Sequence, residues 1–170
     1  ITCSFIQNAG EVSLAGIEFE GIWMPTAALS LRAAIGTLDG EFDTYDYNGV
    51  DISDKANLLY APELTVSLGA DHTSNLFGGE LILSANFSFQ DEVYTQTPWA
   101  LYDPATFPKV TIDSWESLDL SATYLMDTSS GTFKIMVYGT DVLEDGNRVQ
   151  RRYTTGSFTW AELAPRQQFG

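Results

Sequence analysis

The sequence predicts an all-β fold of about seven antiparallel strands, either an up-and-down meander that forms a segment of a large transmembrane β-barrel or a soluble β-sandwich. Three observations predict it. Apolar and polar residues alternate with a period of two in several segments, and no long segment has helical periodicity. Short links between these segments alternate with long polar links.

The segment 81–90 shows the alternation most clearly, because its apolar and polar residues fall on opposite faces of an extended chain. The same pattern recurs along the sequence. It predicts strands at 3–24 (with a bulge near 8–10), 28–43, 62–74, 79–94, 115–127 and 131–143, and the start of another at 166.

One residue fixes the phase of its whole strand, so the pattern also predicts which residues share a face. The apolar, lipid-facing set is Leu64, Val66, Leu68, Leu81, Leu83, Phe87, Phe89, Leu118, Leu120 and Tyr124. The polar, lumen-facing set is Glu63, Thr65, Asp71, Ser84, Asn86, Ser88, Gln90 and Asp119.

The links between the strands favour a barrel. Long links fall at 43–62, 95–114 and 144–165, and links of about 20 unstructured residues are uncommon in compact soluble domains. Outer-membrane barrels combine short periplasmic turns with longer extracellular loops. A secreted, soluble β-sandwich that binds carbohydrate through loop aromatics would show the same alternation and remains the alternative; a β-rich hydrolase is less favoured.

Composition restricts the function. The 170 residues suit one domain, and the net charge of −15 argues against a nucleic-acid partner. The single cysteine, Cys3, cannot form an intrachain disulfide, and no Cys/His cluster could hold zinc. Apolar runs are too short for a transmembrane helix. We expect no cofactor and no metal.

Four stretches, in sequence order, resemble TonB-dependent outer-membrane receptors. The first stretch resembles an early strand of that family's C-terminal barrel region and consists of Asn8-Ala9-Gly10-Glu11 with Gly16-Ile17-Glu18-Phe19-Glu20. The second resembles the strand one hairpin later and consists of Ala61-Pro62-Glu63-Leu64-Thr65 with Ser67-Leu68-Gly69-Ala70. The third stretch resembles the penultimate strand and consists of Lys134-Ile135-Met136-Val137-Tyr138-Gly139, followed by Asp141 and Glu144-Asp145. The fourth stretch resembles the opening of the last strand and consists of Ala164-Pro165-Arg166-Gln167-Gln168-Phe169-Gly170. The family usually has Asn and Leu where this chain has Asp141 and Val142.

The resemblance implies that residues 1–170 are the C-terminal portion of a receptor barrel, without the plug domain and the end of the final strand. It implies a location in the outer membrane of a Gram-negative bacterium, among lipid and lipopolysaccharide. It also implies active import of a siderophore or another bulky nutrient, energised by TonB through the plug. Such a protein is a receptor rather than an enzyme, so no catalytic residue is expected.

Two groups of loop residues are candidate ligand contacts. Trp99 and Tyr102 could stack on a ligand, whereas Tyr94 and Trp115 are more typical of an interfacial aromatic girdle. Arg148, Arg151 and Arg152, in the last long link, could attract an anionic ligand or lipopolysaccharide phosphate. Alternatively, these arginines balance the nearby acidic residues Asp141, Glu144 and Asp145.

Two further patterns are weaker. Asp46, Asn48 and Gly49 fit part of a calcium-binding loop, but the position of the first ligand is Thr44 and that of the bidentate ligand is Lys55. A solvated acidic loop is therefore the favoured interpretation. His72 follows Asp71 in a predicted strand, where neighbours point to opposite faces, so a catalytic triad is not expected.

Overall fold

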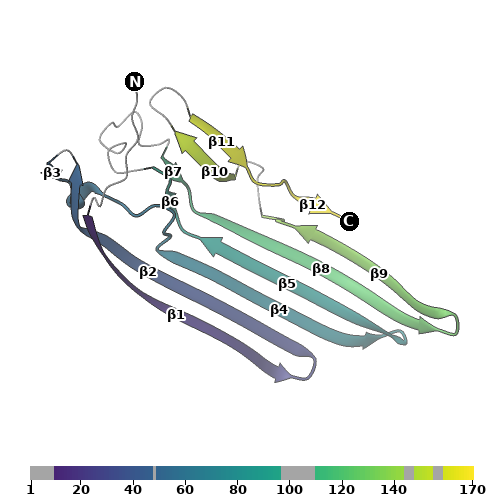
Figure 1. The fold of residues 1–170 in the computed structure, drawn as a ribbon. Coiled ribbons are helices and arrows are strands. Elements are labelled where there is room, and N and C mark those ends of the chain that lie inside the picture. The colour runs from purple at the N-terminus through teal and green to yellow at the C-terminus, as the bar shows by residue number, and fades with distance from the viewer. Residues whose placement is uncertain (1–9, 48, 97–109, 144–147, 155–158) are drawn as a thin grey trace.

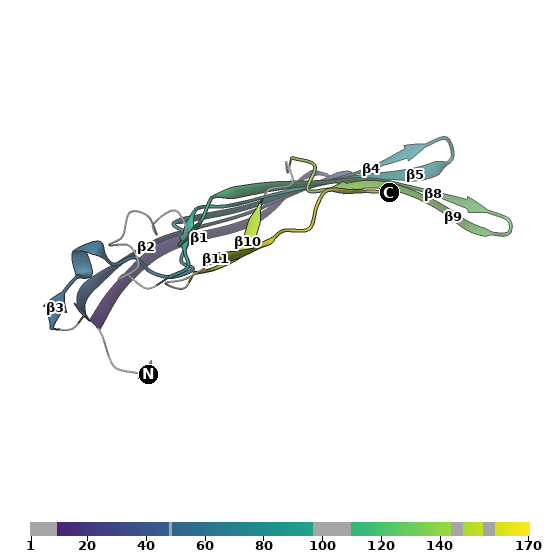
Figure 2. The same ribbon diagram turned by 90° about the horizontal axis from the view of Figure 1, so that it is seen from above.

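The computed structural model describes residues 10–47, 49–96, 110–143, 148–154 and 159–170. Its long strands lie side by side in one curved antiparallel layer (Figure 1, Figure 2). They are β1 (Gly10–Thr26), β2 (Leu29–Tyr47), β4 (Leu64–Leu76), β5 (Gly79–Gln90), β8 (Trp115–Thr128) and β9 (Gly131–Thr140), and the short strand β12 (Gln168–Phe169) joins the same layer at its edge.

The strand order is β1-β2-β4-β5-β8-β9-β12, with β3 (Val50–Asp51) paired to β2. Each long strand pairs antiparallel with the next along the chain, which confirms the predicted up-and-down meander. The sheet is open, with β1 and β12 at its edges, because these strands are too few to close a barrel of about 22 strands. The face-packed sandwich is therefore not favoured.

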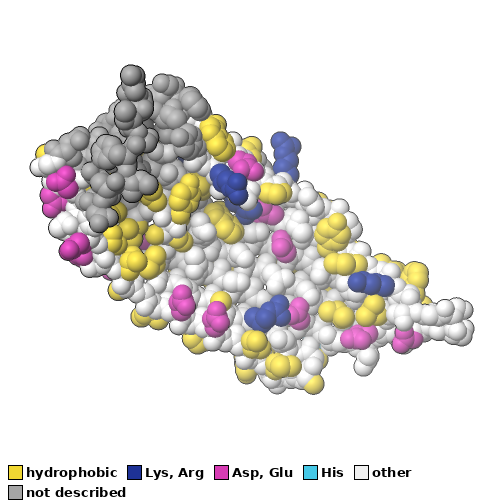
Figure 3. Space-filling model, viewed as in Figure 1, with side chains coloured by type: hydrophobic (Ala, Val, Ile, Leu, Met, Phe, Trp, Pro, Cys, Tyr) yellow, Lys and Arg dark blue, Asp and Glu magenta, His cyan; other side chains and the backbone are white. Residues whose placement is uncertain are grey.

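The register confirms the predicted division of the faces. Phe87 lies opposite Leu68 on β4 and Leu118 on β8. Its neighbour Ser88 lies opposite Ser67 and Ser117. The sheet therefore has an apolar face and a polar face, and Figure 3 shows a face on which few hydrophobic side chains lie over the middle of the strands.

Within the part of the chain that the structure describes, no second layer packs against the apolar face. Large side chains on it are strongly exposed, among them Ile17 at 74%, Phe19 at 59% and Trp23 at 65%. Among the described residues, the buried apolar side chains are Ile52, Val93, Val110 and Ile112, and all lie outside the long strands. The sheet is thus a wall that lacks a hydrophobic core of its own.

The ends of several strands differ from the prediction. Strand 79–94 ends at Gln90: the Asp91 N–H still donates to Leu64 O of β4, and the chain then enters a separate small sheet. Strand 131–143 ends at Thr140, because Asp141 adopts a left-handed conformation with φ of 54°. Strand 28–43 continues to Tyr47, since β1 pairs with it as far as Tyr45.

Differences at the two ends of the chain are smaller. Residues 3–9 of the first predicted strand, and with them most of the bulge predicted near 8–10, lie outside the described residues; within these, a register shift occurs between Glu11 and Val12. The last strand begins at Gln168 instead of residue 166.

The short links are tight turns. Between β4 and β5, Phe77 (φ 49°) and Gly78 (φ 80°) are both left-handed, which is the backbone of a type I′ hairpin turn. The Tyr124 hydroxyl of β8 donates to Leu76 O at 3.0 Å and so ties this turn to the next hairpin. In the described part of the chain, no helix has the length and apolarity to cross a membrane.

Candidate functional site

The long links form a structured layer at one end of the sheet, which we call the loop layer (residues 49–63, 91–96, 110–113, 148–154 and 159–163). It contains the short helix η1 (Ser53–Lys55) and two small sheets, β6 (Val93–Tyr94) with β7 (Thr111–Ile112) and β10 (Val149–Thr154) with β11 (Thr159–Leu163). The long links were expected to be unstructured, and this expectation was wrong for the described parts.

The loop layer is held by backbone hydrogen bonds between different links. The Tyr60 N–H donates to Tyr94 O at 2.9 Å, joining the first long link to the second. Within the second link, the Thr95 N–H donates to Val110 O at 2.7 Å. Strand β10 of the third link contacts β7 of the second. The links therefore form one connected layer.

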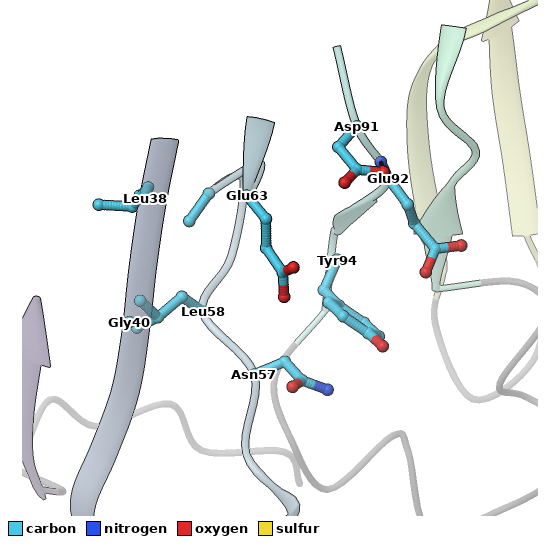
Figure 4. Close-up of a pocket in the computed structure, with 9 residues that line it drawn as sticks. Leu38, Gly40, Asn57, Leu58, Glu63, Asp91, Glu92 and Tyr94 are labelled. Carbon is cyan, nitrogen blue, oxygen red and sulfur yellow. Dashed lines mark hydrogen bonds between the residues drawn. The ribbon is translucent and has the colours of Figure 1, made fainter. Parts of the chain in front are cut away.

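A pocket of about 200 Å³ opens between β2 and the start of the loop layer (Figure 4). Its lining comes from three chain segments: Leu38, Gly40, Asn57, Leu58, Ala61, Glu63, Asp91, Glu92 and Tyr94. Figure 4 shows the Glu63 carboxylate, the Tyr94 ring and the Asn57 amide pointing toward the same space. The pocket can accept hydrogen bonds through several carboxylate oxygens.

Electrostatics in the pocket act on the Tyr94 phenol. Partial burial raises the pKa of Tyr94, and the negative charges of Glu92 and Glu63 raise it further. Like an ordinary tyrosine, the phenol is a protonated hydrogen-bond donor at neutral pH, and the raised pKa extends this state to more alkaline pH. The sequence favoured an aromatic girdle for Tyr94; in the structure its side chain is half-buried in the loop layer and lines this pocket.

The acidic loop after β2 uses its carboxylates on its own backbone. Asp51 Oδ1 accepts hydrogen bonds at 3.0 Å from the N–H groups of Tyr45 and Ser53, which lower the pKa of Asp51. Asp46 accepts from the Gly49 N–H at 2.9 Å. In the described parts of the chain, no group of three or more His, Cys, Asp or Glu residues is arranged to hold a metal ion. Asn48 lies outside these parts.

His72 lies on the apolar face, opposite Leu29 and Leu83, and its Nδ1 is 3.0 Å from Ala28 O. Asp71 lies on the polar face, where it accepts a hydrogen bond from the Ser84 hydroxyl at 2.7 Å. The two side chains are on opposite sides of the sheet, as the strand pattern predicted.

Asp71 belongs to a polar network that connects three strands. Arg32 on β2 forms an ion pair with Asp71 on β4 and donates to Asn86 Oδ1 on β5 at 3.2 Å. Sequence reasoning missed this network. A signal was present, because Arg32 and Asp71 are opposite charges in neighbouring predicted strands.

The predicted arginine contacts do not form one patch. Arg148 is 3.2 Å from the Asp141 carboxylate, and its guanidinium lies 4.7 Å from the centre of the Trp115 ring. Arg151 is exposed and 3.9 Å from Glu162. Arg152 is the next residue on β10, so it faces the opposite side of that strand and is half-buried. Trp99 and Tyr102 lie outside the described residues.

Sequence reasoning also missed the pocket as a unit. Glu63 was assigned to the lumen face, and Asp91 and Glu92 were assigned to a continuous strand. Two adjacent carboxylates directly after the last alternating residue, Gln90, could have indicated that the strand ends there.

A family model described as "TonB dependent receptor-like, beta-barrel" matches residues 1–140. The chain belongs to this family. The TonB-dependent receptors are outer-membrane proteins of Gram-negative bacteria that bind nutrient ligands and TonB, and they are receptors and transporters. The resemblance inferred from the four sequence stretches is thereby confirmed. No curated protein matches the sequence.

Two solved structures of TonB-dependent receptors are similar to this barrel segment. The ferric yersiniabactin uptake receptor FyuA from Yersinia pestis is 17% identical, with a TM-score of 0.67 over 92% of this chain. The ferric preacinetobactin receptor BauA from Acinetobacter baumannii is 19% identical, with a TM-score of 0.64 over 94% of this chain. This TonB-dependent receptor segment spans 22% of each of those chains.

Proposed function

We propose that residues 1–170 form the C-terminal portion of the barrel of an outer-membrane receptor that imports a siderophore or another bulky nutrient with energy from TonB. Its plug domain lies elsewhere in the polypeptide. The main support is the one-layered sheet with an exposed apolar face, since such a face suits lipid and the opposite polar face suits a water-filled lumen.

The polar face and the loop layer supply the rest of the argument. Arg32, Asp71 and Asn86 lie on the face opposite the apolar side chains, where charges meet water rather than lipid. The loop layer, which contains the buried apolar side chains of the described residues, lies at the end of the wall that carries the long links. We assign this end to the cell exterior, where a ligand arrives first.

Ligand contacts are proposed in the loop layer. Arg151 and Arg152 on β10 offer positive charge for an anionic ligand such as a ferric chelate, and Trp99 and Tyr102 would stack on its planar groups. Arg148 contributes less directly, because its guanidinium already contacts Asp141 and Trp115. Lipopolysaccharide phosphate is the second anion that these arginines could bind.

The test uses the full-length receptor in its own bacterium. A strain lacking the gene should lose iron-limited growth on one member of a panel of purified ferric siderophores, and the intact gene should restore it. The variant with both Arg151→Ala and Arg152→Ala should weaken restoration at low siderophore concentration. Unchanged growth of the deletion strain on every ferric siderophore would contradict siderophore uptake and leave cobalamin or saccharide import for the same assay.

A further inference from the structure

Strand β9 ends in a bend that β8 holds in place. Asp141, the residue after β9, is left-handed at φ 54°, a conformation that few residues other than glycine, asparagine and aspartate adopt. Its N–H donates to Asp119 Oδ1 at 2.7 Å, and the next N–H, of Val142, donates to Leu118 O at 2.8 Å. Both acceptors are on β8, so the bend is fixed to the wall.

The bend places a carboxylate in a nearly buried position. Asp141 is only 6% exposed, and a carboxylate at such depth requires a partner. Arg148 Nη2 lies 3.2 Å from Asp141 Oδ2, and the same guanidinium lies 4.7 Å from the Trp115 ring centre. Asp141 and Trp115 both belong to the wall, at the end of β9 and the start of β8.

Arg148 is at the same time part of the β10–β11 hairpin. Its carbonyl oxygen accepts the Ala164 N–H at 2.8 Å, which closes the hairpin at its base, next to the Val149–Leu163 pair. One residue therefore contacts the wall through its side chain and the hairpin through its backbone. Arg151, three residues on, differs: its side chain is 70% exposed and its Glu162 partner, also in the hairpin, is 3.9 Å away.

We propose that Arg148 is a positioning residue that fixes the β10–β11 hairpin relative to the barrel wall through Asp141 and Trp115. Two contacts of different kinds, an ion pair and a cation–π contact, constrain both the distance and the orientation of the guanidinium. The hairpin, which carries Arg151 and Arg152, is thereby held at a defined place above the strands. This role goes beyond the proposed transport function and does not depend on the identity of the ligand.

The experiment measures the hairpin position in the full-length receptor, purified in detergent. Spin labels are attached to Ala161→Cys on β11 and Asp39→Cys on β2, both exposed positions, in a background without other reactive cysteines. Double electron–electron resonance then reports the distance distribution between them. The native receptor should give one narrow maximum.

Arg148→Ala should broaden the distribution and remove its single maximum, because the hairpin loses the ion pair and the cation–π contact that Arg148 makes with the wall. Arg148→Lys should restore a single maximum in part, since lysine keeps the charge and can lie over an indole. The matched control Arg151→Ala should leave the distribution narrow. Asp141→Asn, which retains the backbone bond to Asp119 but removes the ion pair, should broaden it as Arg148→Ala does.

Two outcomes would overturn the proposal: a narrow, unshifted maximum in Arg148→Ala, or equal broadening in Arg148→Ala and Arg151→Ala. Far-UV circular dichroism verifies that each variant keeps its sheet. Should Arg148→Ala fail to fold, Asp141→Asn and Arg148→Lys decide the question by the same criterion. No ligand is needed, so failure here is separate from failure of the uptake assay.

Discussion

Arg32 on β2 forms its ion pair with Asp71 directly above Gly69 on β4. A Cβ at position 69 would lie 2.8 Å from Arg32 Nη2 and 2.9 Å from its Nε. The glycine therefore provides the space in which the guanidinium reaches both Asp71 and Asn86.

Replacing this glycine tests that relationship. Gly69→Ala should lower the free energy of unfolding by about 1 kcal/mol, because the methyl group displaces the guanidinium from a pair that solvent partly screens. Urea unfolding in detergent measures the loss. In an Arg32→Ala background, Gly69→Ala should not lower the free energy of unfolding. An equal decrease in both backgrounds would show that the added methyl group does not act through the Arg32 guanidinium.

The second prediction concerns the two faces of β5. Phe87→Arg should impair assembly by about 2–4 kcal/mol, since it places a charge among lipid-facing side chains near mid-membrane. Ser88→Arg, opposite Ser67 and Ser117 on the polar face, should be tolerated. Labelling in intact membranes provides the direct measurement: a water-soluble maleimide should modify Ser88→Cys and spare Phe87→Cys. Equal labelling of both would mean that the segment does not span a bilayer.

The third prediction concerns Tyr94 and alkaline pH. Burial, Glu92 and Glu63 raise the pKa of Tyr94, so the folded protein retains this proton at a pH where the unfolded chain, with an ordinary value of about 10, has lost it. The resulting stabilisation is fully present below about pH 10 and is lost as the pH rises through the raised pKa.

Ultraviolet titration of tyrosinate measures this effect. Tyr94→Phe should remove a late step from the titration curve. Glu92→Gln should move that step to lower pH, because one of the negative charges that oppose ionisation is gone. A titration curve that keeps its late step in Tyr94→Phe would assign the step to a different tyrosine.

The fourth prediction concerns the β4–β5 turn. Phe77 is left-handed and 89% exposed at the first central position of a type I′ turn, where Asn is the favoured residue. Phe77→Asn should raise the free energy of unfolding in detergent by about 1 kcal/mol, because Asn adopts this conformation more easily. Phe77→Ala serves as the control and should bring no such gain; an equal gain would attribute the effect to loss of the aromatic ring.

The sequence was most informative where residues alternate strictly. In 81–90, period-two alternation is sufficient to define the phase, and the pairing of Phe87 with Leu68 and Leu118 follows once neighbouring strands alternate in the same way. The boundaries were less predictable. Strand β5 ends at Gln90 because the chain then joins a separate small sheet, and β9 ends at Thr140 because Asp141 is left-handed; alternation encodes neither.

The loop layer was the least predictable part. Tyr94 forms a pocket with Glu63 and Asn57, which are distant in the sequence, so only tertiary contacts between links bring them together. The same holds for Arg148, because the sequence did not decide whether this residue binds a ligand or balances nearby acidic residues. In the structure, the Arg148 guanidinium contacts the Asp141 carboxylate and also the Trp115 ring.

The location of the buried side chains has an evolutionary consequence. A residue on the wall is constrained by polarity and β-propensity but hardly by shape, because no opposing layer must fit against it. Wall residues can therefore be exchanged among many apolar or many small polar types without changing the fold, and FyuA and BauA keep it at 17% and 19% identity. Around Ile52, Val93, Val110 and Ile112, in contrast, a substitution must also conserve volume. Sequence divergence among close homologues should accordingly proceed fastest along the lipid-facing strands and slowest at these four positions.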